Sequence, residues 1–301
     1  MAPFAGLSDA ARARLEAIGP RWGENIVAHR KVVLEVYTPL LARVPRDGIE
    51  VARDLAYGPH PRHRLDVYRR AGTAHAPVLA FVHGGAFVRG EKDANAEIYG
   101  NVPRWFARNG CVGVNVEYRL APEAPYPGGA EDVARAVGWL KANAREFGGD
   151  PERIFLMGHS AGGAHAAAHV CDPAARPPAG HGVAGLALVS ARLRADARPD
   201  NPNANGVRAY YGADESRYAA RSVVTHAANL DVPVCIAVAE FENPLLDVYG
   251  AELFHALSAH RGRAPRFLRL AGHNHTSMVA HFDTAEERLG REILDLIVRN
   301  T

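Results

Sequence analysis

The sequence predicts an α/β fold in which one mostly parallel sheet carries helices on both faces. Apolar runs of strand length recur along the chain, and amphipathic patterns of helix length separate several of them. Such alternation is typical of a parallel sheet, because parallel strands need crossover connections that cover both faces. A chain of 301 residues, 48% of them hydrophobic, can bury one large core, so we expect a single domain over residues 1–301.

The elements follow one another in a regular order. The expected strands are residues 64–68, 77–82, 111–117, 153–157, 184–190, 232–239 and 265–270. The first of them follows Tyr57 and a stretch containing Pro and His, and we expect it to enter the sheet antiparallel. Helical patterns cover residues 130–147, where apolar side chains form one stripe, and residues 245–260.

A serine between two glycines follows the expected strand 153–157. The motif is Gly158-x-Ser160-x-Gly162, and a small-residue helical segment begins at Ala161. A buried strand that turns sharply into a helix at such a serine is typical of a nucleophile elbow. The helix dipole at this point favours developing negative charge. Ser160 is therefore the candidate nucleophile.

A second glycine motif follows the strand expected at residues 77–82. The chain continues there as His83-Gly84-Gly85-Ala86-Phe87. Free backbone N–H groups of Gly84 and Gly85, with that of Ala161, would stabilise the oxyanion of a tetrahedral intermediate. A phosphate cradle is the weaker interpretation, because the chain has neither the dinucleotide spacing nor a Gly-Lys-Ser/Thr ending here.

From Tyr57 to Ala168 the chain resembles the hormone-sensitive-lipase-like branch of the α/β-hydrolases. The motifs that carry the resemblance are Arg64-Leu-Asp-Val-Tyr68, His83-Gly-Gly85, Tyr118-Arg-Leu-Ala-Pro-Glu123, Gly148-Gly-Asp-Pro151 and Gly158-His-Ser-Ala-Gly-Gly163. The resemblance implies an α/β-hydrolase fold with a mostly parallel eight-stranded sheet and a helical cap. It also implies a serine carboxylesterase or lipase. In one departure, Ala86 replaces the common third glycine of the oxyanion loop, which leaves the backbone donor but narrows the space beside it.

Two segments outside the sheet-and-helix rhythm would form the cap. They are residues of about 8–44, which carry a helical pattern, and about 192–230, which are rich in Asn, Pro, Ala and Arg. A plain packing helix is the weaker interpretation of residues 8–44. The aromatic side chains expected to line an acyl or aryl pocket, which would also suit a core, are Trp22, Tyr37, Phe87, Tyr210 and Tyr211.

The acid and base should follow the nucleophile, because triad members in this fold come in the order Ser, Asp or Glu, His. The family usually has Asp directly before a Pro after the strand expected at 232–239, but this chain has Asn243 there. Asn cannot carry the charge that stabilises an imidazolium, so Glu242 is the expected acid. Glu240 and Asp247 remain the alternatives.

The base is expected on the loop after the last strand, residues 265–270. Matching to the family favours His275, with His273 as the alternative. These histidines and the nearby carboxylates lack the three-ligand spacing of zinc-type sites, so we expect no metal and no cofactor.

The remaining features concern partners and location. A formal charge of +2 is too small to indicate nucleic acid, and no apolar run approaches the ~20 residues of a membrane span. The N-terminal segment lacks the pattern of a secretory signal. The three cysteines, Cys111, Cys171 and Cys235, suit reduced thiols and a cytoplasmic location. A small-molecule ester or amide is the expected partner, and a homodimer is left open.

Three functions are considered. The first is a serine hydrolase that cleaves short to medium carboxylic esters through an acyl-enzyme, with Ser160, His275 and Glu242. The second is an amide hydrolase similar to kynurenine formamidases, which carry a motif like Gly90-Glu91-Lys92. The third is a small-molecule receptor on a hydrolase fold, which the presence of a serine, a carboxylate and a histidine in the right order disfavours.

Overall fold

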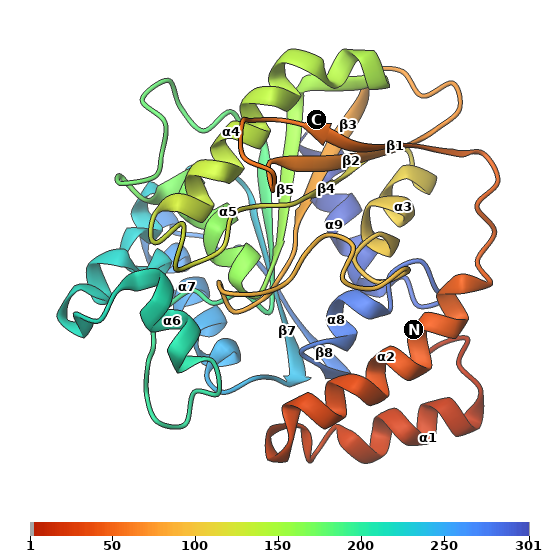
Figure 1. The fold of residues 1–301 in the computed structure, drawn as a ribbon, viewed down its shortest axis with the longest axis horizontal. Coiled ribbons are helices and arrows are strands. Elements are labelled where there is room, and N and C mark those ends of the chain that lie inside the picture. Colours follow the sequence, from red (N-terminus) through yellow and green to blue (C-terminus); the bar gives the residue numbers. More distant parts are fainter. Residues whose placement is uncertain (1–2, 301) are drawn as a thin grey trace.

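One eight-stranded sheet runs through the computed structural model, which describes residues 3–300 (Figure 1). Its strand order is β1-β2-β4-β3-β5-β6-β7-β8. Strand β2 runs antiparallel to both of its neighbours, and all the other pairs are parallel. The mostly parallel sheet expected from the sequence is thus confirmed. The strands are β1 (Ile49–Ala56), β2 (Arg64–Arg70), β3 (Ala76–Val82), β4 (Val112–Val116), β5 (Gly149–His159), β6 (Gly185–Val189), β7 (Val234–Phe241) and β8 (Arg266–Asn274).

The helices lie on both faces of this sheet and at the ends of its strands (Figure 1). The α-helices are α1 (Asp9–Ile18), α2 (Ile26–Ala42), α3 (Asn101–Arg108), α4 (Gly128–Asn143), α5 (Ala161–Cys171), α6 (Ala204–Tyr211), α7 (Leu246–Arg261), α8 (Ser277–Ala280) and α9 (Arg288–Arg299). The 3₁₀-helices are η1 (Trp22–Glu24), η2 (Ala144–Phe147), η3 (Glu215–Arg217), η4 (Ala219–Arg221) and η5 (Val223–Asn229). Both helices expected between strands are present, as α4 continued by η2 and as α7.

Successive side chains of the central strands belong alternately to two hydrophobic clusters, one on each face of the sheet. In β3, Val78 and Ala80 pack with α4, α5 and α7 on one face. Leu79 and Phe81 face the opposite way and pack with α3, α8 and α9. Because successive side chains of a strand point to opposite faces, an unbroken apolar run is what a sheet covered on both sides requires.

Strand β1 was not expected from the sequence. It forms an edge of the sheet, and only Ile49, Ala52 and Leu55 are partly buried along it. Its register with β2 shifts between Ala52 and Leu55. An exposed edge strand with an irregular register needs neither an apolar run nor a clean alternation, so the usual strand signals are absent.

Four histidines are buried in the core and are held neutral by it. Burial lowers the pKa of His165 to about 3, and it lowers the pKa of His83, His169 and His281 to about 4. Their ordinary value is 6.5. Between that value and the lowered ones, the unfolded chain binds protons that the folded chain does not. The contribution of these histidines to the free energy of unfolding is therefore fully present above pH 6.5 and is lost as the pH falls towards 4.

We expect the free energy of unfolding, measured with urea, to be lower at pH 5 than at pH 7. The loss should be on the order of 2 kcal/mol for each such histidine. His165→Gln should weaken this pH dependence, whereas His255→Gln, a change at an exposed position of α7, should leave it as in the unaltered protein. Equal stability at the two pH values would contradict the prediction.

Candidate active site

Ser160 stands on a sharp turn between β5 and α5. Its backbone angles are φ 55° and ψ −119°, a conformation that a non-glycine residue adopts rarely and under strain. The turn is held from both sides, because the Ser160 N–H donates to Val189 O (3.1 Å) and its carbonyl accepts from Arg192 N (3.0 Å). The serine side chain is thereby presented on a rigid corner at the carboxyl ends of the parallel strands.

The glycines around Ser160 are required by close backbone approach. A Cβ atom on Gly158 would lie 2.5 Å from Gly162 O, and one on Gly162 would lie 2.2 Å from Val82 O. Both distances are far below van der Waals contact. Only glycine at these positions lets β5, α5 and the end of β3 meet at the turn.

His275 and Glu242 form a buried pair beside this turn. Nδ1 of His275 lies 2.5 Å from Oε1 of Glu242, whose side chain is 2% exposed. Burial by itself raises the pKa of Glu242, but the charge and hydrogen bond of His275 outweigh it and hold the pKa below its usual value. The backbone N–H groups of Ala239 (3.2 Å) and Asn243 (2.9 Å) also donate to this carboxylate. Glu242 is therefore an anion oriented to bind the imidazole through Nδ1, which leaves Nε2 for another partner.

The alternative acids and the alternative base lie elsewhere. Glu240 accepts a hydrogen bond from Gly272 N (2.7 Å) and pairs with Arg269, and Asp247 is exposed in the first turn of α7. His273 is fully buried, with Nε2 2.8 Å from Glu286 Oε1 and Nδ1 3.0 Å from Ser277 Oγ. Glu286 also accepts from Phe4 N (2.7 Å), so this second His–Glu pair fastens the N-terminal segment to the end of the chain.

The loop after β3 approaches Ser160 closely. A Cβ on Gly84 would lie 3.0 Å from Ser160 Cβ, and one on Gly85 would lie 1.7 Å from Arg89 O. The N–H groups of Gly84 and Gly85 donate to no other group among residues 3–300, and Ala161 begins α5, where N–H groups lack intrahelical acceptors. Ala86 has φ 50°, the left-handed region in which a glycine would be less strained.

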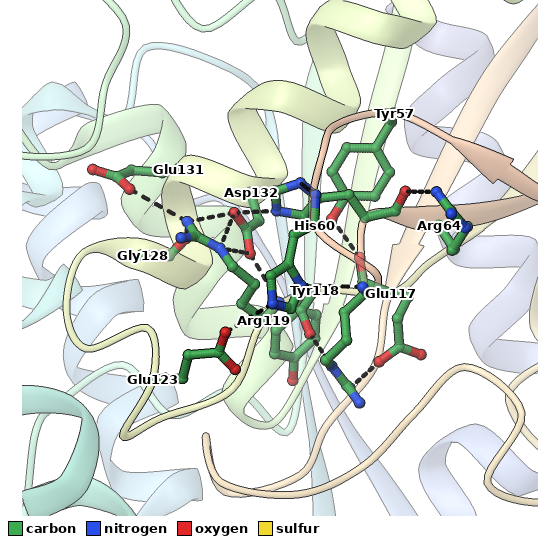
Figure 2. A network of polar contacts seen from close by, with 12 residues as sticks. Tyr57, His60, Arg64, Glu117, Tyr118, Arg119, Glu123, Gly128, Glu131 and Asp132 are labelled. Atoms are coloured by element: carbon green, nitrogen blue, oxygen red, sulfur yellow. Dashed lines mark hydrogen bonds and ion pairs between the residues drawn. The ribbon is translucent and has the colours of Figure 1, made fainter.

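A polar network around Arg119 and Asp132 (Figure 2) is connected through Tyr118 to the start of this loop. The carboxylate of Asp132, fully buried on α4, accepts from the backbone (2.8 Å) and side chain (2.9 Å) of Arg119, and His63 Nε2 lies 3.0 Å from it. Tyr118, next to Arg119, donates its hydroxyl to His83 O (2.8 Å) and stacks on the imidazole, with centroids 4.5 Å apart. The Tyr118-Arg119 motif therefore holds the residue that begins the glycine loop, His83.

A cavity of about 390 Å³ opens at Ser160 and His275. Helix α2 supplies one side of its wall, including Ile26, Arg30 and Leu34, and Pro202 and Asn203 come from the segment 192–230. The rest of the wall includes residues 84–86 and 89–91 of the loop after β3 and the residues Ile98, Tyr99, His159, Asn243, Thr276 and Val279. Both segments expected to form the cap thus reach the site. Nothing in the sequence pattern singled out Arg30 as a wall residue, because an isolated polar residue carries no periodic signal.

The aromatic side chains expected to line the pocket are packed in the core instead. Phe87 stacks on Tyr210 with centroids 4.6 Å apart and contacts Tyr211 edge to face. Tyr37 and Trp22 are buried in the cluster formed by α1 and α2. Trp22 nevertheless acts on the wall indirectly, because its indole N–H donates to Asn243 Oδ1 (2.8 Å).

The residues that suggested a formamidase separate in space. Glu91 lines the cavity. Lys92 is not part of the cavity wall and is itself buried, with Nζ 3.0 Å from the buried Asp66, 2.9 Å from Asp54 and also paired with Asp93. Lys92 therefore stabilises the connection between β2 and the glycine loop and does not face the cavity.

Two further structural observations concern metals and membranes. In the described part of the chain, no group of three or more His, Cys, Asp or Glu side chains is arranged to hold a metal ion. Across residues 3–300, no helix has both the length and the apolar character needed to cross a bilayer.

Comparison with known sequences places this geometry in a family. A sequence profile of the alpha/beta hydrolase fold family matches residues 79–275, which is more than half of the chain and includes Ser160, Glu242 and His275. The chain belongs to the alpha/beta hydrolase fold family. The resemblance noted from the motifs is thereby confirmed at the level of the family.

Curated relatives match the central part of this chain. A probable isoprenylcysteine alpha-carbonyl methylesterase (ICMEL1) of Oryza sativa subsp. japonica is 39% identical over 120 residues, covering 40% of this chain and 27% of that protein. Esterase LipC of Mycobacterium tuberculosis is 42% identical over 113 residues, or 37% of this chain and 27% of LipC. The matched region thus spans about a quarter of the length of these relatives.

Solved structures share the fold of this chain over nearly all of its 301 residues. Esterase B from Lactobacillus rhamnosis superposes with a TM-score of 0.72 at 18% identity, covering 97% of this chain and 96% of that one. A hyperthermophilic esterase from the archaeon Pyrobaculum calidifontis gives a TM-score of 0.69 at 22% identity, with 97% of each chain covered. At these identities the likeness concerns the fold.

Proposed function

We propose that this hydrolase cleaves carboxylic esters with Ser160 as nucleophile, His275 as base and Glu242 as the acid that orients the base. The observation that carries the proposal is that an elbow serine and a histidine bound to a buried carboxylate open on one cavity. The printed names of the curated relatives, which are esterases, support the same activity.

The reaction proceeds in two steps. His275 Nε2 takes the proton of Ser160 Oγ while Oγ attacks the ester carbonyl, and the negative charge of Glu242 stabilises the imidazolium that forms. Collapse of the tetrahedral intermediate breaks the bond to the alcohol, which leaves with the proton from His275. Water, deprotonated by the same imidazole, then attacks the acyl-enzyme and releases the acid and free Ser160.

The oxyanion of each tetrahedral intermediate is held by backbone donors. The unpaired N–H groups of Gly84 and Gly85 and the N–H of Ala161 lie around Ser160. Each such donor contributes about 3 kcal/mol to transition-state stabilisation. Because the Tyr118 network fixes the loop beforehand, these donors need no rearrangement during the reaction.

The dimensions of the cavity favour short to medium esters. About 390 Å³ is near the lower end of the usual range for small-molecule sites. Helix α2 and residues 202–203 line it, which supports their role as a cap, and Ala86 also lines it beside Gly84 and Gly85. Each methylene that fails to fit costs about 1–3 kcal/mol of discrimination.

The test is a series of p-nitrophenyl esters. We expect a burst of p-nitrophenol from the acetate, as an acyl-enzyme requires, and efficient turnover up to about hexanoate with little activity on long-chain triglycerides. Absence of any turnover would support the receptor alternative. Faster hydrolysis of an aryl formamide such as N-formylkynurenine than of every ester would support the amide alternative.

A further inference from the structure

Two exposed arginines line the cavity that holds Ser160 and His275. Arg30 is carried by α2, and Arg89 lies in the loop that turns back on itself after the oxyanion donors, with its N–H bonded to Gly85 O (3.0 Å). Both residues are part of the cavity wall, although they are far apart in the sequence. Two independent segments therefore bring positive charge to the same opening.

Neither guanidinium is neutralised by a carboxylate. Among residues 3–300, Arg30 and Arg89 form no ion pair, and the side-chain bond of Arg89 runs from Nη2 to the neutral amide Oδ1 of Asn203 (2.9 Å). Many other arginines of this chain are paired, for example Arg104 with Asp283 (2.5 Å). The charges at the cavity are thus available to a ligand.

The two positive charges also act on each other and on the interior of the cavity. Partial burial, followed by the charge of Arg30, lowers the pKa of Arg89. Arg30 is also one of the charges that oppose protonation of His159, next to Ser160, after burial and His275. An anion between the arginines would relieve their repulsion in addition to forming charge-assisted hydrogen bonds.

The same wall carries other polar groups that a ligand would meet. Glu91 is exposed, lines the cavity and forms no ion pair within the described residues, so it opposes an anion on its own side. The amide of Asn243 is oriented by Trp22, because the indole N–H of Trp22 donates to Asn243 Oδ1 and leaves Nδ2 free to donate to a ligand. Glu242 is bound to His275. The unpaired charges of the wall therefore comprise two cations and one anion.

We propose that the preferred substrates are esters whose acyl chain ends in a carboxylate, held by Arg30 and Arg89 while Ser160 attacks the ester carbonyl. Guanidinium groups match carboxylates in geometry and retain their charge at all physiological pH values. The products would be a dicarboxylate and an alcohol. This inference rests on the proposed ester hydrolysis and names the substrate class of the same site.

The experiment compares two substrates of matched length. Mono-p-nitrophenyl glutarate and p-nitrophenyl pentanoate both have five acyl carbons and differ in the terminal carboxylate. We expect kcat/KM to be about tenfold higher for the glutarate at low ionic strength, and the ratio to fall as salt is added. The neutral ester serves as the internal reference for each variant.

Substitutions of the positive and negative wall residues should change the glutarate-to-pentanoate ratio of kcat/KM in opposite directions. Arg30→Met and Arg89→Met should each lower the ratio about threefold or more, Arg89→Lys should keep most of it, and Glu91→Gln should raise it. Arg70→Gln, at an exposed position outside the cavity wall, is the matched control and should leave the ratio unchanged. A purely structural role of the arginines would not make Glu91→Gln act in the opposite direction.

Failure of this inference is distinguishable from failure of the proposed function. A ratio of one or below that no variant changes, with the pentanoate well hydrolysed, would overturn the inference and leave the esterase activity intact. If neither ester is hydrolysed, calorimetric binding of monomethyl glutarate decides. Binding that Arg89→Met weakens would support the anion site, and no binding would overturn it.

Discussion

Ser160→Ala is expected to lower kcat/KM for p-nitrophenyl acetate by at least about 10⁴-fold, because it removes the oxygen that attacks the ester. The fold should persist, since the hydrogen bonds that tie Ser160 to the end of β6 are made by its backbone. Steady-state kinetics measure the first effect, and urea unfolding measures the second.

Ser258→Ala is the matched control for this change. Ser258 lies on α7, away from the cavity wall, and its hydroxyl donates to Phe254 O (2.7 Å). Its loss should leave kcat/KM within about twofold, as for most substitutions away from a site. Turnover close to that of the unaltered protein in Ser160→Ala would remove the nucleophile from the proposal and the mechanism with it.

His275→Ala should be comparably inactive, because removal of nucleophile or base from such a unit has similar consequences. The measurement is kcat/KM for the same ester. Its matched control is His273→Ala, which deletes a buried imidazole that bonds Glu286 and Ser277. That variant should lose about 1–3 kcal/mol of stability and retain most of its activity.

The opposite pattern, an inactive His273→Ala with an active His275→Ala, would transfer the role of base to His273.

The acid can be examined in the same way. Glu242→Gln should cost about 10³-fold or more, because a neutral amide neither fixes the imidazole tautomer nor stabilises the imidazolium. Glu240→Gln, which affects only the bond to Gly272 and the pair with Arg269, should have little effect on turnover.

The central sheet was predictable because its signals are strong and local. The strand that became β3 is an unbroken apolar run, as burial on both faces demands, and the turn at Ser160 needs glycines at fixed distances. Edge strand β1 gave no such signal, because its pairing with β2 is irregular and its side chains are largely exposed.

Within the site, identifying the acid required a choice between two neighbouring positions, 242 and 243. The sequence placed Glu242 and Asn243 side by side before Pro244, and only the conformation of the turn brings the carboxylate of Glu242 to His275. The aromatic residues illustrate the opposite difficulty. Phe87 and Tyr210 have the composition of a pocket wall, but mutual stacking holds them in a core, and composition cannot distinguish the two environments.

The bonds that fasten the N-terminal segment have a consequence for how the protein is made on the ribosome. Phe4 bonds Glu286, 282 residues further along, and Trp22 bonds Asn243, 221 residues further along. Helices α1 and α2 are therefore synthesised long before Asn243 and Glu286, the two residues to which the N-terminal segment is bonded. Until then α1 and α2 of the nascent chain can pack on each other and on Ile98, but the apolar surface that meets Ala280 stays uncovered. The α2 wall of the cavity, with Arg30, is fastened in place only after residue 286 has been synthesised.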